Sequence, residues 1–299
     1  MEKISFYDQI SKNKRNSFIL GGLVFFILVC LIYVISQILA PDLAIIFFFF
    51  AIVIMILYIY GTYTYGDKVV LATTKAKLIS EDDRRYVHLI NVVEGLSIAA
   101  GIPKPKLYVI ESDEINAFAT GKDPNHSSIA VTTGLLKNLK RDEIEGVIGH
   151  EISHIRNYDI RFATFVAVLV GLVAILSDLL LRSFWYGGRR NRDERDKLSI
   201  LILVGFVLAI FAPILVRIVQ FAISRRREYL ADASSVELTR YPEGLASALQ
   251  KIMKINEGKM KVSEAVSHLF FADPNKSPLD SLYATHPPLE ERIKILRSM

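Results

Sequence analysis

The possible folds of this chain are limited most by an uncharged, apolar run at residues 18–40 (FILGGLVFFILVCLIYVISQILA). Formed as a helix, the run is long enough to cross a hydrocarbon layer about 30 Å thick. A second apolar run at 43–60 follows the pair Pro41-Asp42 and ends among tyrosines, which favour the membrane interface. Residues 18–65 are therefore predicted to form a transmembrane hairpin, and a content of 52% hydrophobic residues agrees with a membrane protein.

Basic residues on both sides of this hairpin predict its orientation. Lys3, Lys12, Lys14 and Arg15 precede it, and Lys68, Lys75 and Lys77 follow it, whereas the short loop between the two runs holds only Asp42. The positive-inside rule then places residues 1–17 and the region after residue 66 in the cytosol. The first run is too long for a signal-peptide core, and we expect it to be retained as an anchor.

A second pair of apolar runs, at 162–181 and 199–223, predicts a second hydrophobic hairpin over 162–223. The evidence conflicts here, because the loop between the runs is rich in arginine and would lie outside if both runs cross the membrane. Asp178, Pro213 and Arg217 also interrupt the runs. These two segments are therefore either membrane spans or helices that pack on protein and line a polar cavity.

The polar parts of the chain, 66–161 and 224–299, are predicted to form one cytosolic domain interrupted by the second hairpin. An amphipathic helical pattern covers 83–100 and ends at Gly101 and Pro103, and another helix is expected to begin near Arg141. Short β-like stretches at 107–111, 116–120 and 129–133 predict a small antiparallel sheet. The expected fold is a mainly α membrane protein with a small β-sheet.

The segment His150-Glu151-Ile152-Ser153-His154 contains the pattern HExxH. Histidines four positions apart lie on the same face of a helix, so both imidazoles can bind one Zn²⁺. The intervening Glu151 can reach a water at the open coordination position and act as a general base. The alternative interpretation is a helix with two surface histidines, which a third ligand elsewhere in the sequence would disfavour.

Glu228 is the candidate third zinc ligand, because a catalytic zinc usually has three protein ligands and one water. It follows the fourth apolar run, whereas His154 precedes the third run, so a helical hairpin between them would bring these residues together. Asp232, one helical turn after Glu228, can accept a hydrogen bond from a ligand histidine. Asp159 is either an acid at a helix end or a partner of a ligand, and the sequence favours the first role. A juxtamembrane ion pair remains the alternative role for Glu228, and an ordinary surface acid remains the alternative for Asp232.

The chain resembles the HtpX family of membrane zinc metalloproteases in four motifs and in its two N-terminal spans. The motifs are HEISH at 150–154, REYLAD at 227–232, NAFATG at 116–121 and THPP at 285–288. That family is related to the CAAX prenyl proteases. The resemblance implies a zincin-like metalloprotease domain joined to two hydrophobic hairpins. It further implies that His286 stabilises the tetrahedral intermediate and that Asn116 and Ala117 bind substrate backbone along an edge strand.

The function expected from these features is ATP-independent, zinc-dependent endopeptidase activity on misfolded or damaged membrane proteins at the cytosolic face. One catalytic zinc ion is expected, and the partners are peptide or membrane-protein substrates and the bilayer. Neither a nucleotide nor a nucleic acid is expected, because no Walker-A motif is present and the net charge of +5 is concentrated beside the apolar runs. Two alternatives remain open: a CAAX-type prenyl-peptide protease and a non-catalytic metal-binding membrane protein.

Overall fold

A computed structural model describes most of the chain and divides it into two compact units. The described residues are 6–39, 41–160, 172–182, 203, 205–207, 209–212, 214, 227–257, 260, 269–272 and 287–299. Met1–Thr62 and Phe165–Gln220 form the first unit, here called the hydrophobic unit. Tyr63–Thr164 and Phe221–Met299 form the second, here called the site unit.

Long helices dominate the hydrophobic unit. Helix α1 spans Phe6–Leu39, and a 3-10 turn covers Pro41–Leu43. Helix α2 spans Ala44–Thr73, and its part from Tyr63 onward belongs to the site unit. The predicted turn at Pro41-Asp42 therefore exists. Pro41–Gly61 is long and apolar enough to cross a membrane, whereas Gly22–Ile38 is a shorter apolar helix. Large apolar side chains of α2 such as Phe50 are 64% exposed, an arrangement that suits contact with lipid.

The second predicted hairpin lies largely outside the described residues. A helix covers 172–182, where Val173 and Leu180 are fully buried against the core of the hydrophobic unit. Among the residues that the structure describes, a single helix meets the length and composition of a membrane span. The fold is therefore a mostly helical one with a small sheet, and the hairpin at 162–223 stays a prediction.

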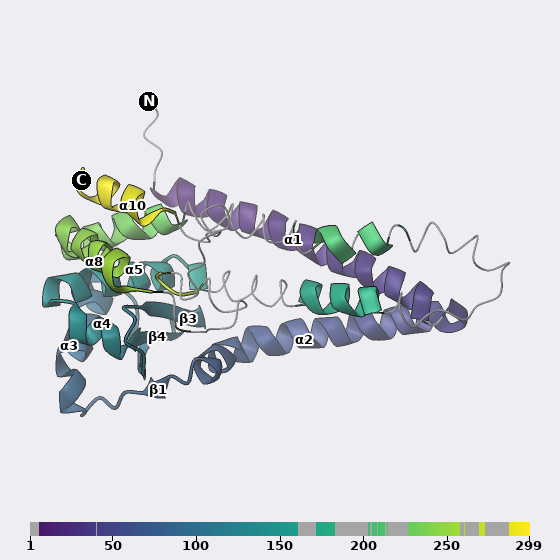
Figure 1. Cartoon of the computed structure of the whole chain (residues 1–299), viewed down its shortest axis with the longest axis horizontal. Coiled ribbons are helices and arrows are strands. Elements are labelled where there is room, and N and C mark those ends of the chain that lie inside the picture. The colour runs from purple at the N-terminus through teal and green to yellow at the C-terminus, as the bar shows by residue number, and fades with distance from the viewer. Residues whose placement is uncertain are drawn as a thin grey trace. The chain divides into compact units, whose positions relative to one another are not determined.

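A four-stranded sheet organises the site unit (Figure 1), with the strand order β1-β2-β4-β3. The strands are Lys77–Leu78 (β1), Lys106–Ile110 (β2), Ala117–Asp123 (β3) and His126–Thr132 (β4). The three longer strands agree with the sequence prediction, and the Asp123-Pro124-Asn125 turn joins β3 to β4 as an antiparallel pair. Strand β1, by contrast, was not anticipated.

The prediction of a purely antiparallel sheet was wrong. Strand β4 inserts between β2 and β3, pairing parallel with β2 and antiparallel with β3. The physical reason lies in its side chains, because residues 127–132 of β4 are all buried on both faces, as expected for a central strand. This insertion leaves β3 at the edge of the sheet.

Helices pack against this sheet and form one core with it (Figure 1). They are Val87–Ala100 (α3), Thr133–Asn138 (α4), Arg141–Arg156 (α5), 227–239, Pro242–Ile255 (α8) and Leu289–Leu296 (α10). Helix α3 ends as predicted at Gly101, which adopts a left-handed φ of 68°. Helix α5 begins at the predicted place, and the Lys140 amide donates to Glu143 Oε2 at 2.6 Å.

Close contact of backbones fixes the position of α5 within the core. A Cβ atom added to Gly146 would lie 2.6 Å from the Leu245 amide nitrogen, so α5 approaches the start of α8 where only glycine fits. The Ser235 hydroxyl donates to the Gly146 carbonyl at 2.7 Å and joins α5 to the helix at 227–239.

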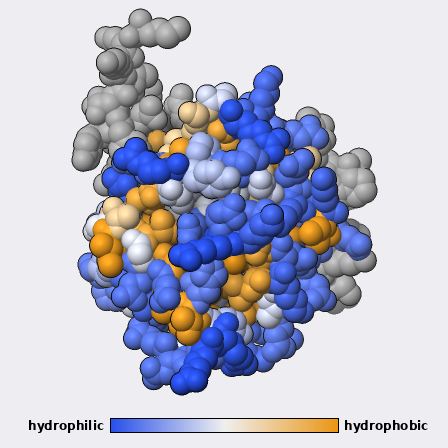
Figure 2. Space-filling model, turned by 90° about the vertical axis from the view of Figure 1, so that its left-hand side faces the viewer, coloured by the Kyte–Doolittle hydropathy of each residue, from blue (hydrophilic) through white to orange (hydrophobic). Residues whose placement is uncertain are grey.

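The face of the site unit shown in Figure 2 is mostly hydrophilic, as expected for a domain in contact with water.

Candidate metal centre

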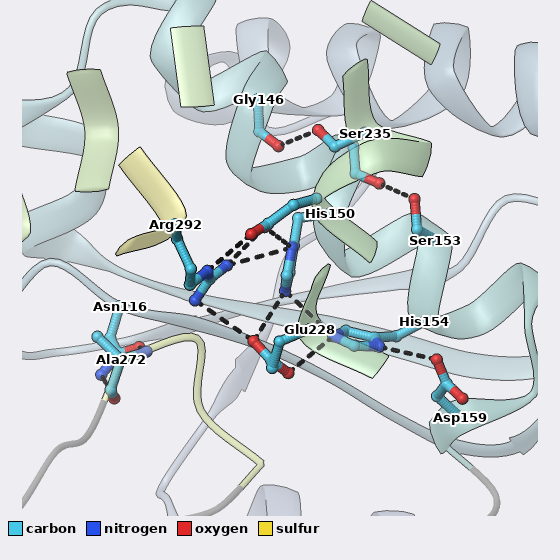
Figure 3. Close-up of polar contacts among 12 residues, drawn as sticks. Asn116, Gly146, His150, Ser153, His154, Asp159, Glu228, Ser235, Ala272 and Arg292 are labelled. Atoms are coloured by element: carbon cyan, nitrogen blue, oxygen red, sulfur yellow. Dashed lines mark hydrogen bonds and ion pairs between the residues drawn. The ribbon is translucent and has the colours of Figure 1, made fainter. Parts of the chain in front are cut away.

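Helix α5 places the two histidines and the glutamate of the HExxH pattern at least partly out of contact with solvent. His150 is 1% and Glu151 2% exposed, and His154 is partly buried one turn further along the helix. The Nε2 atoms of the two histidines lie 3.1 Å apart (Figure 3). The histidines are therefore not surface side chains, because both turn the same ring nitrogen toward one point.

Glu228 faces these histidines from the separate helix at 227–239. Its Oε1 lies 3.4 Å from His154 Nε2, and its Oε2 lies 3.6 Å from His150 Nε2. Ligand atoms bound tetrahedrally at about 2.0–2.1 Å from one zinc ion lie about 3.3 Å apart, so this donor set fits a zinc site. Among the described residues, His150, His154 and Glu228 form a group that could hold a metal ion. The predicted approach of Glu228 to the histidines is present.

Each histidine is held by an aspartate on its other ring nitrogen. Asp232 Oδ1 lies 2.9 Å from His150 Nδ1, which agrees with the predicted role of Asp232. Asp159 Oδ2 lies 3.1 Å from His154 Nδ1, so of its two possible roles the favoured one, a helix-end acid, was wrong and the other, a partner of a ligand histidine, is present. The turn after α5, in which Tyr158 has a positive φ of 61°, brings Asp159 back to the ring. An acceptor on Nδ1 leaves Nε2 as the metal-binding atom.

Arg292 and Arg227 complete these two arrangements and were missed by the sequence analysis. Arg292, fully buried on α10, donates from Nε to Asp232 Oδ2 at 2.8 Å and from Nη2 to Asp232 Oδ1 at 2.7 Å. Arg227 Nη1 lies 3.4 Å from Asp159 Oδ1. A signal for Arg292 does exist in the sequence, because it occupies the helical face otherwise formed by Leu289, Ile293 and Leu296.

The carboxylates raise the pKa values of both histidines in the metal-free protein. Burial opposes protonation of His150, but hydrogen bonds to Asp232 and Glu228 outweigh it and raise the pKa. Burial likewise opposes protonation of His154, while Asp159 and Glu228 raise its pKa to about 10. The site therefore attracts positive charge, which either protons or a divalent cation can supply.

Glu151 and Asp232 have opposite electrostatic environments. Burial raises the pKa of Glu151 above its ordinary value, although the two histidines and the Ala119 amide act in the other direction. Burial would also raise the pKa of Asp232, but Arg292 and His150 outweigh it and lower the pKa. Glu151 is thus the more readily protonated of these two buried acids.

Asn116 and Ala117 lie where the sheet edge meets the site, and both bind backbone. The Ala117 carbonyl accepts from the Phe271 amide at 2.8 Å. The Asn116 side chain donates to the Ala272 carbonyl at 2.8 Å and accepts from the Ala272 amide at 3.0 Å. Their present partner is the chain's own segment Phe271–Ala272, which is almost entirely buried. His286, the other residue with an expected role, lies outside the described residues.

Comparisons with known proteins agree with this geometry. A sequence model of Peptidase family M48 matches residues 83–299, which include the whole metal centre. A protein of Dictyoglomus turgidum described as "Protease HtpX homolog" is 45% identical over 100% of this chain and 96% of its own length. Proteins with the same description from Streptococcus uberis and Listeria monocytogenes serotype 4b are 41% and 44% identical, each over 98% of this chain and 99% of its own length.

The crystal structure of S. mikatae Ste24p has a similar fold, with a TM-score of 0.54 at 20% sequence identity, over 99% of this chain and 67% of that protein. The fold, the HExxH helix and Glu228, the acidic third member of the metal-binding group, define a metalloprotease. The chain belongs to Peptidase family M48.

Proposed function

We propose that this metalloprotease is a zinc-dependent endopeptidase, held in the membrane by its apolar helices, that cleaves misfolded or damaged membrane proteins at the cytosolic face without ATP. The convergence of His150, His154 and Glu228 beside Glu151 supports this proposal most strongly. Two imidazoles and one carboxylate are the donors of many catalytic zinc sites with one open position. A purely structural zinc site would instead be closed by four protein ligands.

The roles of the chain's own residues follow from their environments. Bound zinc would supply an acidic water and polarise the scissile carbonyl. Glu151 would accept a proton at its carboxylate from the attacking water and donate it to the leaving amine, and the raised pKa of this carboxyl suits a group that must hold a proton between the two transfers. Asp232 and Asp159 hold the ligand rings in place. His286 is proposed, from the family resemblance alone, to stabilise the tetrahedral oxyanion.

The edge of β3 is the proposed binding site for an extended substrate. The Ala117 carbonyl points away from β4, where it accepts from the Phe271 amide, and Ala119 faces the same side because alternate residues of an antiparallel strand share a direction. The contacts of Asn116 and Ala117 with Phe271–Ala272 support their ability to hold a polypeptide backbone. Recognition through backbone groups demands little of the substrate sequence, which suits a protease of damaged proteins.

Two membrane hairpins, at 18–65 and 162–223, are proposed with the site unit in the cytosol. The span Pro41–Gly61 and the apolar helix Gly22–Ile38 support the first hairpin. The second rests on the sequence alone, and labelling of a cysteine placed at Gly187 in intact cells tests it. A reagent that cannot cross the membrane should react with this cysteine if both segments cross, and should not react if they remain on the cytosolic side.

An assay on the purified, detergent-solubilised protein tests the proposed activity. Cleavage of an unfolded membrane protein should stop after chelation and return when Zn²⁺ is added. A farnesylated peptide, tested in parallel, separates this function from that of a CAAX-type protease. Absence of zinc-dependent cleavage of either substrate would favour a non-catalytic metal-binding protein.

A further inference from the structure

Arg292 makes contacts with the metal centre that go beyond charge balance. We propose that it is a positioning residue, whose guanidinium fixes Glu228 directly and His150 through Asp232. The inference rests on the proposed zinc-dependent function, and it assigns control of two of the three metal ligands to one side chain of the C-terminal helix α10. Figure 3 shows Arg292 directed toward His150 and Glu228.

The first part of this arrangement runs through Asp232. Arg292 donates hydrogen bonds to both oxygens of this carboxylate, from Nε to Oδ2 at 2.8 Å and from Nη2 to Oδ1 at 2.7 Å. Such a two-point contact fixes the plane of the carboxylate as well as its position. Oδ1 is also the atom 2.9 Å from His150 Nδ1. The plane of Asp232 therefore determines how the His150 ring presents Nε2 to the metal.

The second part reaches Glu228 directly. Arg292 Nη1 lies 3.3 Å from Oε2 of Glu228, whose other oxygen lies 3.4 Å from His154 Nε2. Within the part of the chain that the structure describes, Nη1 makes no hydrogen bond of good geometry, so this ion pair is its principal polar contact. The three nitrogens of one planar group thus serve two acids on the same helix. A lysine has a single ammonium nitrogen and cannot reproduce this geometry.

The surroundings hold the guanidinium in one orientation. Arg292 is 0% exposed, and its guanidinium carbon lies 5.0 Å from the centre of the Phe271 ring. On the other histidine, Asp159 Oδ2 lies 3.1 Å from His154 Nδ1, and Asp159 Oδ1 lies 3.4 Å from Arg227 Nη1.

Zinc affinity of the full-length protein in detergent tests the proposal without a substrate. Arg292→Met keeps an apolar stem, Arg292→Lys keeps the charge without the planar group, and Arg297→Met is the matched control. Arg297 lies just after α10 and pairs with Glu243 at 2.8 Å on the surface. We expect the zinc Kd to rise about 10- to 100-fold in Arg292→Met and several-fold in Arg292→Lys, and to stay native in Arg297→Met.

Catalysis at saturating zinc provides the second measurement. The kcat of Arg292→Lys should fall while KM for a peptide substrate stays close to the native value, a split that lost stability alone would not produce. A native zinc Kd together with a native kcat in Arg292→Lys would overturn the proposal, and this variant decides the matter if Arg292→Met does not fold. If the native protein binds zinc but cleaves no peptide, the proposed function fails while the zinc measurement still tests Arg292.

Discussion

Asp232 Oδ1 lies 2.9 Å from His150 Nδ1, although the two residues belong to different helices, and both side chains are almost fully buried. Asp232→Asn should therefore raise the zinc Kd about 10- to 100-fold, because a neutral amide holds the imidazole less strongly and Arg292 loses one of its two anionic partners. Titration with a zinc-competing chelator measures the change. Asp113→Asn, at an exposed side chain, is the control, and an unchanged Kd in Asp232→Asn would contradict the assigned role.

The stability of the metal-free protein should fall as the pH rises. The pKa of His154 is about 10 in the folded protein, above its ordinary value of 6.5, so its protonation stabilises the fold fully below pH 6.5. This contribution is lost as the pH rises toward about 10, and His154→Gln should flatten the dependence. Urea unfolding in the presence of a chelator at pH 6.5 and pH 9.5 measures the effect. Equal slopes in the native protein and His154→Gln would refute the prediction.

Gly146→Ala should destabilise the site unit by about 1–3 kcal/mol, because its new methyl group would meet the backbone of α8 at Leu245. Gly95→Ala is the matched control in the exposed part of α3, where a Cβ atom would meet nothing within 4 Å. This control should be neutral or stabilise the protein by up to about 1 kcal/mol, since alanine favours a helix over glycine. Thermal unfolding compares the two, and equal effects would contradict the close approach of α5 and α8.

Asn116→Ala should raise KM for a peptide substrate while zinc affinity stays native. The side chain binds backbone next to the site, and its hydrogen bonds go to Ala117, Met260 and Ala272 rather than to a proposed metal ligand. Some loss of stability, about 1–3 kcal/mol, should accompany the change, because the Ala272 backbone loses its buried partner. Asn138→Ala, which removes a contact with the Gly134 carbonyl, serves as the control. A native KM in Asn116→Ala would argue against substrate binding there.

Local patterns in the sequence were sufficient to predict parts of the fold and of the site. Helical periodicity and the glycine at 101 predicted α3 and its end, and the spacing of His150 and His154 predicted the shared ligand face of α5. Glu228 could be placed because a hairpin returns the chain to its starting point, an argument about topology rather than local preference. The comparisons with relatives confirm the family resemblance.

Features that depend on distant contacts could not be predicted. The parallel pairing of β2 with β4 depends on which strand becomes central, and no short pattern determines that choice. Arg292 acts on Asp232 across 60 positions and on His150 across 142 positions. Asp159 lies only five positions after His154, but its role depends on the backbone turn at Tyr158. Contacts of this kind are determined by packing.

Cleavage by Glu151→Gln tests the central claim most directly, because this change removes the proposed base and retains all three proposed zinc ligands. The purified variant should bind zinc with an affinity close to the native value, while kcat/KM for an unfolded membrane protein should fall at least about 100-fold. Zinc content and cleavage rate are measured on the same preparation. Cleavage at the native rate by the zinc-loaded variant would contradict the assignment of Glu151 as the general base.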